Sequence, residues 1–239
     1  MNTQYRALVV TPVKNAVENT IATIKSIAAS NVDVLHTVYN DYSDVETEKI
    51  LEQNTSVFGY ELIHLRNLTS SPSPNYKTVL QHAQRRALDL GLDLIIVESD
   101  VEVKADTFEQ LISFNSEHTN SALVGAITVG YDGQVNFPYL KFKNEPKKAV
   151  KTNRSLSFCC TLLANRYLQT FDFLNLDSSK DWYDTIISHK ALELSFENYI
   201  LMNVPTLHKP HGSRPWKQLK YTNPLKYYWL KLIKGRDKI

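Results

Sequence analysis

The sequence predicts an α/β fold with a mostly parallel, wound central sheet flanked by helices. Short apolar runs typical of buried strands alternate with stretches of helical apolar spacing over residues 5–103. Parallel strands need helical crossovers, so this alternation favours one sheet covered by helices. The second half is less regular, and a turn at residues 131–134 predicts a small antiparallel element there.

The first half supplies the elements of the parallel sheet. The apolar runs predict strands over residues 5–10, 32–39, 60–65 and 94–97, and helices over 18–30, 46–53 and 75–90. Pro12 is expected to end the first strand, because proline cannot donate a ladder hydrogen bond. Asn15, with Glu18 three residues later, predicts a capped helix start. Gly91 is the expected end of the third helix.

The second half predicts helices over residues 107–117 and 181–194 and strands over 122–129, 155–163 and 199–204. The lysine-rich stretch 141–151 is expected to be exposed. We expect one domain over 1–212, with a nucleotide-binding half of about 1–103 and an acceptor half of about 104–212. Residues 213–239 form a basic, aromatic tail.

Composition bounds the function. The chain has 239 residues and a formal net charge of +2, which gives no reason to expect a nucleic-acid partner. Cys159 and Cys160 are adjacent, an arrangement unsuited to a structural disulfide, so both are expected to be small buried side chains in a reducing compartment. The sequence shows no secretory signal and no apolar run of about 20 residues. A cytoplasmic location follows as an expectation.

The predicted site is built around the acidic stretch that follows residues 94–97. The apolar run 94–97 leads into Glu98, Ser99, Asp100 and Glu102. On an extended chain the three carboxylates would share a face and repel one another unless a cation lay between them. Ligands of open α/β sheets bind beyond the carboxyl ends of the strands. The stretch therefore predicts a divalent metal site in a cleft, and the alternative is that these acids simply face water.

The landmarks follow one another in a recognisable order. A Thr-Pro turn (Thr11, Pro12) is followed by an acidic turn over 40–44, a DXD-like Glu98-Ser99-Asp100, Asp181 at a helix start, and Pro205 before His208. From residue 5 to about residue 213 this order resembles a family 2 glycosyltransferase with the GT-A fold.

The resemblance implies an inverting transferase that moves a sugar from a nucleotide diphosphate, expected to be UDP, to a hydroxyl of a glycan or lipid-linked acceptor. It implies Asp181 as the catalytic base, and Asp100 and His208 as ligands of Mn²⁺ or Mg²⁺. The residues that it places at the nucleotide are Thr11, Pro12, Val13, Asp41, Lys77, Glu98 and Ser99.

Each assignment has a structural alternative. Asp181 suits a helix cap, with Asp184 as a rival base, and Asp41 suits a plain turn. His208 suits an ordinary loop, and Lys77 a solvated helix face.

Several positions depart from the family pattern, and these departures bear on the expected donor specificity and activity. These positions are Asn40, Tyr42, Gln81, His82, Glu98 and Lys180. A nucleotide-sugar binding protein with impaired catalysis is therefore one alternative function. A sugar nucleotidyltransferase is another, although residues 11–15 contain no glycine for a phosphate loop.

The tail combines aromatic and basic residues. Residues 221–239 interleave Tyr227, Tyr228 and Trp229 with lysines and an arginine. This composition suits the interface of an anionic bilayer, which would place the protein peripherally on the inner face of a membrane. The alternative is that Trp229 and Leu232 pack onto the domain.

Overall fold

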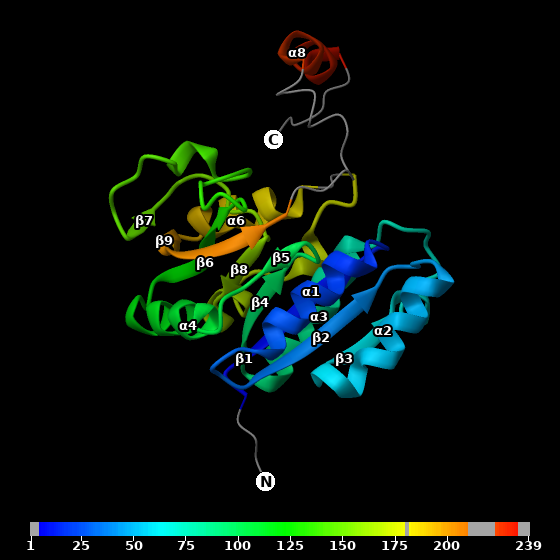
Figure 1. Ribbon diagram of the computed structural model, residues 1–239. Helices are drawn as coiled ribbons and strands as arrows, with labels where there is room; N and C mark the ends of the chain where they lie inside the picture. Colours follow the sequence, from blue (N-terminus) through cyan, green and yellow to red (C-terminus); the bar gives the residue numbers. More distant parts are fainter. Residues whose placement is uncertain (1–4, 180–181, 210–222, 234–239) are drawn as a thin grey trace. The chain divides into compact units, whose positions relative to one another are not determined.

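The computed structural model describes residues 5–179, 182–209 and 223–233. The chain divides into two compact units, Met1–Lys209 and Pro210–Ile239. The first unit holds one mixed sheet flanked by helices (Figure 1). The described part of the second unit is helix α8 (Pro224–Ile233). No helix in the described ranges has the length and apolar character needed to cross a membrane.

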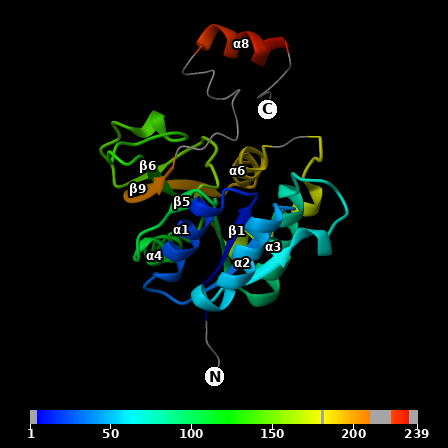
Figure 2. The same ribbon diagram turned by 45° about the vertical axis from the view of Figure 1, so that its right-hand side comes forward.

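The first half forms the parallel part of the sheet, in the order β3-β2-β1-β4. Its strands are β1 (Ala7–Val13), β2 (Val34–Asn40), β3 (Glu61–His64) and β4 (Asp93–Val97). Its helices are α1 (Val17–Ala28), α2 (Val45–Phe58) and α3 (Tyr76–Leu90). From β1 the chain passes to β2 and then to β3, and it returns to β4 on the other side of β1. Helices α1 and α2 therefore lie on one face of the sheet and α3 on the other. Figure 2 shows these helices from a second side. The gap between the carboxyl ends of β1 and β4 is the topological switch point.

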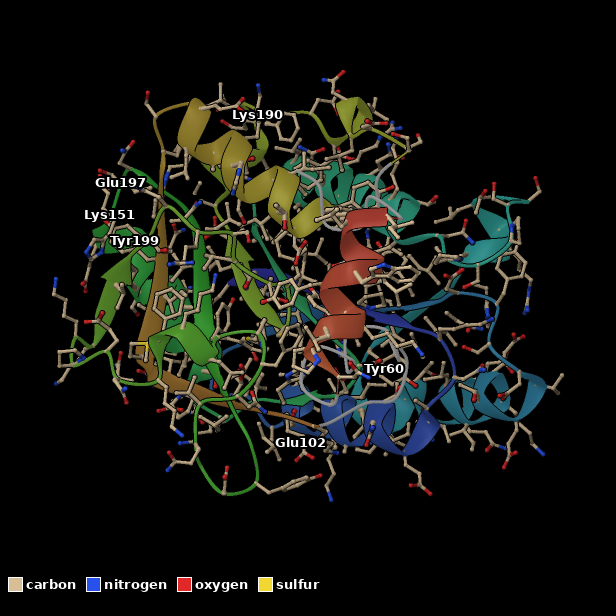
Figure 3. The ribbon with its side chains drawn as sticks, turned by 90° about the horizontal axis from the view of Figure 1, so that it is seen from above. Tyr60, Glu102, Lys151, Lys190, Glu197 and Tyr199 are labelled. Carbon is tan, nitrogen blue, oxygen red and sulfur yellow. The ribbon has the colours of Figure 1, made fainter. Side chains whose placement is uncertain are left out.

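The second half adds antiparallel strands and confirms the predicted mixed α/β class. Strand β8 (Cys160–Leu163) is antiparallel to both β4 and β6 (Ser121–Val129). The long strand β9 (Glu197–His208) is parallel to β6 and pairs antiparallel with β5 (Val101–Glu102) and β7 (Ala149–Lys151). Figure 3 shows Lys151 and Tyr199 beside Glu197, whose carboxylate bonds to both side chains at this edge.

The remaining elements are short or connect these strands. They are α4 (Thr107–Glu117), α5 (Asn165–Leu168), α6 (Tyr183–Glu193) and the 3₁₀ turns η1 (Leu65–Asn67), η2 (Leu140–Phe142) and η3 (Phe173–Asn175). Helix α4 has the predicted bounds. The predicted turn at residues 131–134 is also present, with Gly133 at φ 73°.

The start of the chain differs from the prediction in two respects. Pro12 does not end β1, which continues to Val13 beside β2, whereas its pairing with β4 stops at Val10. Pro12 therefore lies where β1 is paired on one side only, a position that proline tolerates. Asn15 is not the N-cap of α1, because Ala16 occupies that position. The Asn15 side chain instead accepts a hydrogen bond from the Asp44 amide at 2.9 Å.

Strand β9 is longer than predicted and bends. Its partners on β6 jump from Leu201, opposite Ala126, to Pro205, opposite Ile127, so residues 202–204 form an irregularity. Such irregularities redirect the rest of a strand. Beyond this one, β9 reaches β5, where His208 pairs with Val101.

A buried histidine makes the stability of the sheet depend on pH. His36 on β2 is 4% exposed, and its Nε2 lies 3.1 Å from the Thr11 hydroxyl. Its Nδ1 has no hydrogen-bond partner among the described residues. Burial lowers the pKa of His36 to about 3, so the folded protein keeps this ring neutral.

We expect His36 to weaken the fold in acid. The unfolded chain binds a proton at this ring below a pH of about 6.5, but the folded chain does so only near pH 3. Stability is therefore lost as the pH falls through this window, by about 2 kcal/mol between pH 7 and pH 5. Urea unfolding of His36→Gln at the two pH values should show a pH-dependent loss smaller by about this amount. Thr11→Val keeps the imidazole and should keep the full loss, and an unchanged loss in His36→Gln would contradict the assignment.

Candidate active site

The acidic turn that follows β4 is the centre of the site. The sequence suggested an extended chain over residues 98–102. In the structure the chain instead turns at Ser99 and Asp100, before β5 begins. Three backbone hydrogen bonds hold the turn: Glu98 N to Cys159 O at 3.0 Å, Val101 N to Glu98 O at 3.1 Å, and Lys209 N to Asp100 O at 3.0 Å. The starting region of β8 and the end of β9 therefore fix this turn.

The turn separates the three predicted carboxylates. Asp100 is buried and Glu98 is half-buried. Glu102 lies elsewhere and is not simply solvated, because its Oε1 is 2.6 Å from Lys209 Nζ. Two acids remain together at the turn.

His208 meets these acids from the last position of β9. The side chain is buried, and Nδ1 donates to the Phe137 carbonyl at 2.7 Å. In a neutral ring Nε2 is then the nitrogen with a lone pair, and it lies 3.7 Å from Asp100 Oδ2. A metal-binding histidine usually donates its other ring N–H to a partner such as a backbone carbonyl. His208 therefore lies in a strand beside Asp100 and not in an ordinary loop.

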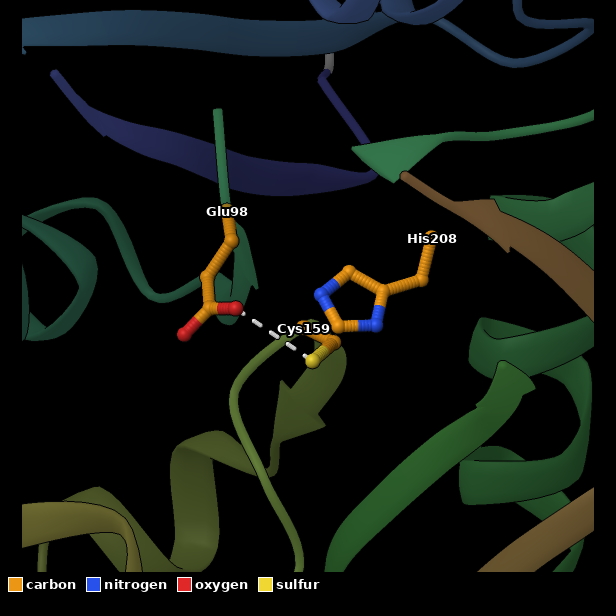
Figure 4. Close-up of side chains that lie close together, drawn as sticks. All are labelled: Glu98, Cys159 and His208. Carbon is orange, nitrogen blue, oxygen red and sulfur yellow. Dashed lines mark hydrogen bonds between the residues drawn. The ribbon is translucent and has the colours of Figure 1, made fainter. Parts of the chain in front are cut away.

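Cys159 belongs to the same cluster, a role that the sequence analysis did not predict. Its Sγ donates to Glu98 Oε2 at 3.3 Å, as Figure 4 shows, and one ligand atom from each of Glu98, Cys159 and His208 lies within 4.8 Å of the others. Burial first, and then the Glu98 charge, raises the pKa of this thiol well above its usual value. Cys160 is a buried free thiol, as predicted.

The cluster fits a divalent cation. Carboxylates from Glu98 and Asp100 and an imidazole from His208 make a donor set for Mn²⁺, and the oxygen atoms also suit Mg²⁺. The structure thus brings together both predicted metal ligands, Asp100 and His208.

Asp41 at the end of β2 is buried and shapes a loop. Its Oδ2 accepts hydrogen bonds from Ser73 Oγ and from the Asn75 amide, and its Oδ1 accepts one from Asn75 Nδ2, all at 2.8 Å. These contacts fix the loop that leads into α3. Oδ1 retains capacity for one further hydrogen bond toward a ligand.

The residues around Asp41 explain two departures from the family pattern. Tyr42 has φ 54°, the left-handed conformation that a glycine would adopt, and its hydroxyl donates to Thr69 O at 2.6 Å. The Asn40 side chain is buried and bonds to Glu48 and to the Ser43 amide. Both substituted positions therefore have local structural partners.

The side chains at the end of β1 are largely buried. The Thr11 side chain is buried against His36, and Val13 O accepts the Asp41 amide at 2.8 Å. Lys77, on the first turn of α3, is not a solvated lysine. Its ammonium donates to Leu176 O and, at 2.8 Å, to Ser178 Oγ.

The predicted base, Asp181, and its neighbour Lys180 lie outside the described residues. Asp184 is described, and its Oδ1 accepts the Thr185 amide at 2.7 Å in the first turn of α6. Burial raises the pKa of Tyr139 well above its usual value, and the charges of Cys159 and Asp184 add to this effect.

Solved structures share this fold. S. aureus TarS 1-349 in complex with UDP-GlcNAc matches with a TM-score of 0.65 at 17% identity, over 94% of this chain and 64% of that one. The mannosyltransferase PcManGT from Pyrobaculum calidifontis, in complex with GDP-Man and Mn²⁺, matches with a TM-score of 0.65 at 13% identity, over 98% and 65%. GalNAc-T7 with UDP, GalNAc and Mn²⁺ matches with a TM-score of 0.62 at 13% identity, over 89% and 45%. This chain spans less than two thirds of each of them.

No curated protein sequence matches the chain. The sequence model of Glycosyl transferase family 2 matches residues 8–167, a range that contains the ends of β1 and β2, the acidic turn and Cys159. This range is more than half of the chain. The chain therefore belongs to glycosyl transferase family 2.

Proposed function

We propose that this chain is an inverting, metal-dependent glycosyltransferase. It moves a sugar from a nucleotide diphosphate to a hydroxyl of a glycan or lipid-linked acceptor. The observation that carries the proposal is that His208 meets Asp100 at 3.7 Å and Glu98 within 4.8 Å, just beyond the carboxyl end of β4. A UDP-sugar is the proposed donor, in keeping with the UDP-GlcNAc of TarS, and the GDP-Man of PcManGT marks the alternative.

In this proposal Asp100 and His208 hold Mn²⁺ or Mg²⁺, and the imidazole favours Mn²⁺. A bound cation neutralises the charge that develops on the leaving diphosphate. Glu98 and Ser99 lie beside the ribose or support the cation. The buried turn keeps the oxygens of Glu98 and Asp100 in place before the donor arrives.

The nucleotide is proposed to lie along the ends of β1 and β2. The backbone of residues 11–13 contacts the base, and Asp41 Oδ1 accepts one of its N–H groups or a ribose hydroxyl. Lys77 uses two of its three N–H donors on residues 176–178, so one donor is left for a phosphate oxygen.

Asp181 is the proposed general base, and Asp184 is its rival in the first turn of α6. A carboxylate that takes the acceptor proton during a direct displacement inverts the anomeric centre. A nucleotidyltransferase is disfavoured because the chain between β1 and α1, residues 14–16, contains no glycine to hold phosphates.

The cation ligands can be tested by binding. Asp100→Asn and His208→Gln should each weaken Mn²⁺-dependent UDP binding by about tenfold or more, because each removes a proposed ligand. Isothermal titration with and without Mn²⁺ measures the effect. Glu102→Gln removes a nearby carboxylate that pairs with Lys209 instead, and it should bind UDP like the wild type. Wild-type affinity in Asp100→Asn would contradict the proposed site.

The base can be tested by turnover. Slow, Mn²⁺-dependent hydrolysis of UDP-sugars by the wild type would separate an enzyme from a protein that only binds nucleotide sugars. Asp181→Asn should lower transfer by about 100-fold or more and leave UDP affinity nearly intact, because a base acts on the acceptor. Asp184→Asn is the matched comparison. If only Asp184→Asn abolishes transfer, the base is Asp184.

We also propose that the tail contacts a membrane carrying the acceptor. In α8, Leu225, Tyr228, Trp229 and Leu232 share one face by helical spacing, and Lys226 follows the first of them. This pattern suits an anionic bilayer surface.

Vesicle sedimentation of the full chain tests this contact. The protein should pellet with phosphatidylglycerol vesicles and remain in solution with phosphatidylcholine alone. Trp229→Ala should weaken binding by about tenfold, because a large apolar side chain no longer enters the bilayer. Tyr131→Ala removes an exposed aromatic of the first unit and serves as the control. Equal binding of both vesicle types or of both variants would contradict the proposal.

A further inference from the structure

A thiol lies inside the cation site. Cys159 is 2% exposed and precedes β8 directly, and its Sγ lies 3.3 Å from Glu98 Oε2. Figure 4 shows Glu98, Cys159 and His208 pointing toward one another from the ends of β4 and β9 and the start of β8. Carboxylate, thiol and imidazole are three different kinds of metal ligand, and here they share one small volume.

The distances in the cluster suit one tetrahedral ion. Zinc bonds of about 2.3 Å to sulfur and about 2.1 Å to oxygen or nitrogen place such ligand atoms about 3.6 Å apart. Cys159 Sγ lies 3.3 Å from Glu98 Oε2, and the ligand atoms of Glu98, Cys159 and His208 all lie within 4.8 Å of one another. The three side chains therefore offer the kinds of donor atom that a zinc site uses, close enough together to share one ion.

Each of the three residues has a further hydrogen bond or contact that holds it in place. The Phe137 carbonyl orients the His208 ring, the Cys159 carbonyl holds the Glu98 amide, and Ser157 Oγ contacts Cys159 Sγ at 3.3 Å. Fixed ligands lose little freedom when an ion binds. Cys160 provides the contrast, because it is fully buried within β8 opposite Val97.

We propose that Glu98, Cys159 and His208 form a mixed oxygen, sulfur and nitrogen site that binds Zn²⁺ and excludes the cation used for catalysis. Thiolate is a soft ligand that favours Zn²⁺ and Cd²⁺ over Mn²⁺ and Mg²⁺. The thiol proton now shared with Glu98 leaves to solvent when the ion binds. The inference uses the cation site of the proposed function, but it does not depend on sugar transfer.

Titration of the metal-free full chain with Cd²⁺ tests the sulfur ligand directly. Binding should produce the ultraviolet sulfur-to-cadmium charge-transfer band at one ion per chain. Cys159→Ala should abolish the band, whereas Cys160→Ala, which removes the adjacent buried thiol, should keep it. Absence of the band in the folded wild type, or its persistence in Cys159→Ala, would overturn the proposal.

Zinc affinity provides the second measurement. Cys159→Ala should lose about tenfold or more in Zn²⁺ affinity and much less in Mn²⁺ affinity. Many sites bind Zn²⁺ more tightly than Mn²⁺, so the ratio of the two affinities does not by itself identify a sulfur ligand. The change in that ratio on Cys159→Ala identifies it. An unchanged ratio in a folded variant would refute the thiol ligand.

Zn²⁺ should also compete with Mn²⁺ in UDP binding. A cadmium band in a protein that binds no UDP would leave this inference standing and defeat the proposed function.

Discussion

The backbone hydrogen bonds around the acidic turn are the constraint on which the site depends. Glu98 and Asp100 are charged groups brought close together with a thiol in a largely buried place, an arrangement that is unfavourable by itself. It persists because the Glu98 amide bonds to Cys159 and the Asp100 carbonyl accepts from Lys209. These contacts join β4 to the start of β8 and to the end of β9. The antiparallel second half of the sheet therefore positions acids that belong to the parallel first half.

Local signals in the sequence predicted much of the fold and part of the site. The apolar spacing and Gly91 indicated the bounds of α3. The family resemblance implied that Asp100 and His208 act together, and in the structure they lie 3.7 Å apart. Cys159 could not be predicted, because its place depends on β8 pairing with β4, a contact between residues far apart in the sequence. Glu102 was predicted on the same face as Glu98 and Asp100, because no local sequence signal indicated the turn at Ser99 and Asp100.

Two departures from the family pattern, Asn40 and Tyr42, have local structural partners. A left-handed backbone costs a non-glycine residue on the order of 1–2 kcal/mol. Tyr42 offsets part of this through its hydrogen bond to Thr69. Asn40, in place of an aspartate, bonds to Glu48, where a carboxylate would be repelled. The altered turn thus keeps Asp41 at the end of β2.

The distribution of charge explains why an exchangeable cation suits the site. Lys209 is the nearest residue along the chain to His208 that could neutralise the cluster permanently, yet its ammonium pairs with Glu102. Asp100 instead faces an imidazole, and Glu98 accepts a hydrogen bond from a thiol, and neither of these groups carries a permanent positive charge. A divalent ion would supply such a charge beside the two carboxylates. The imidazole and the sulfur can themselves become ligands of that ion, and the softness of the ligand that is used decides which ion the site retains.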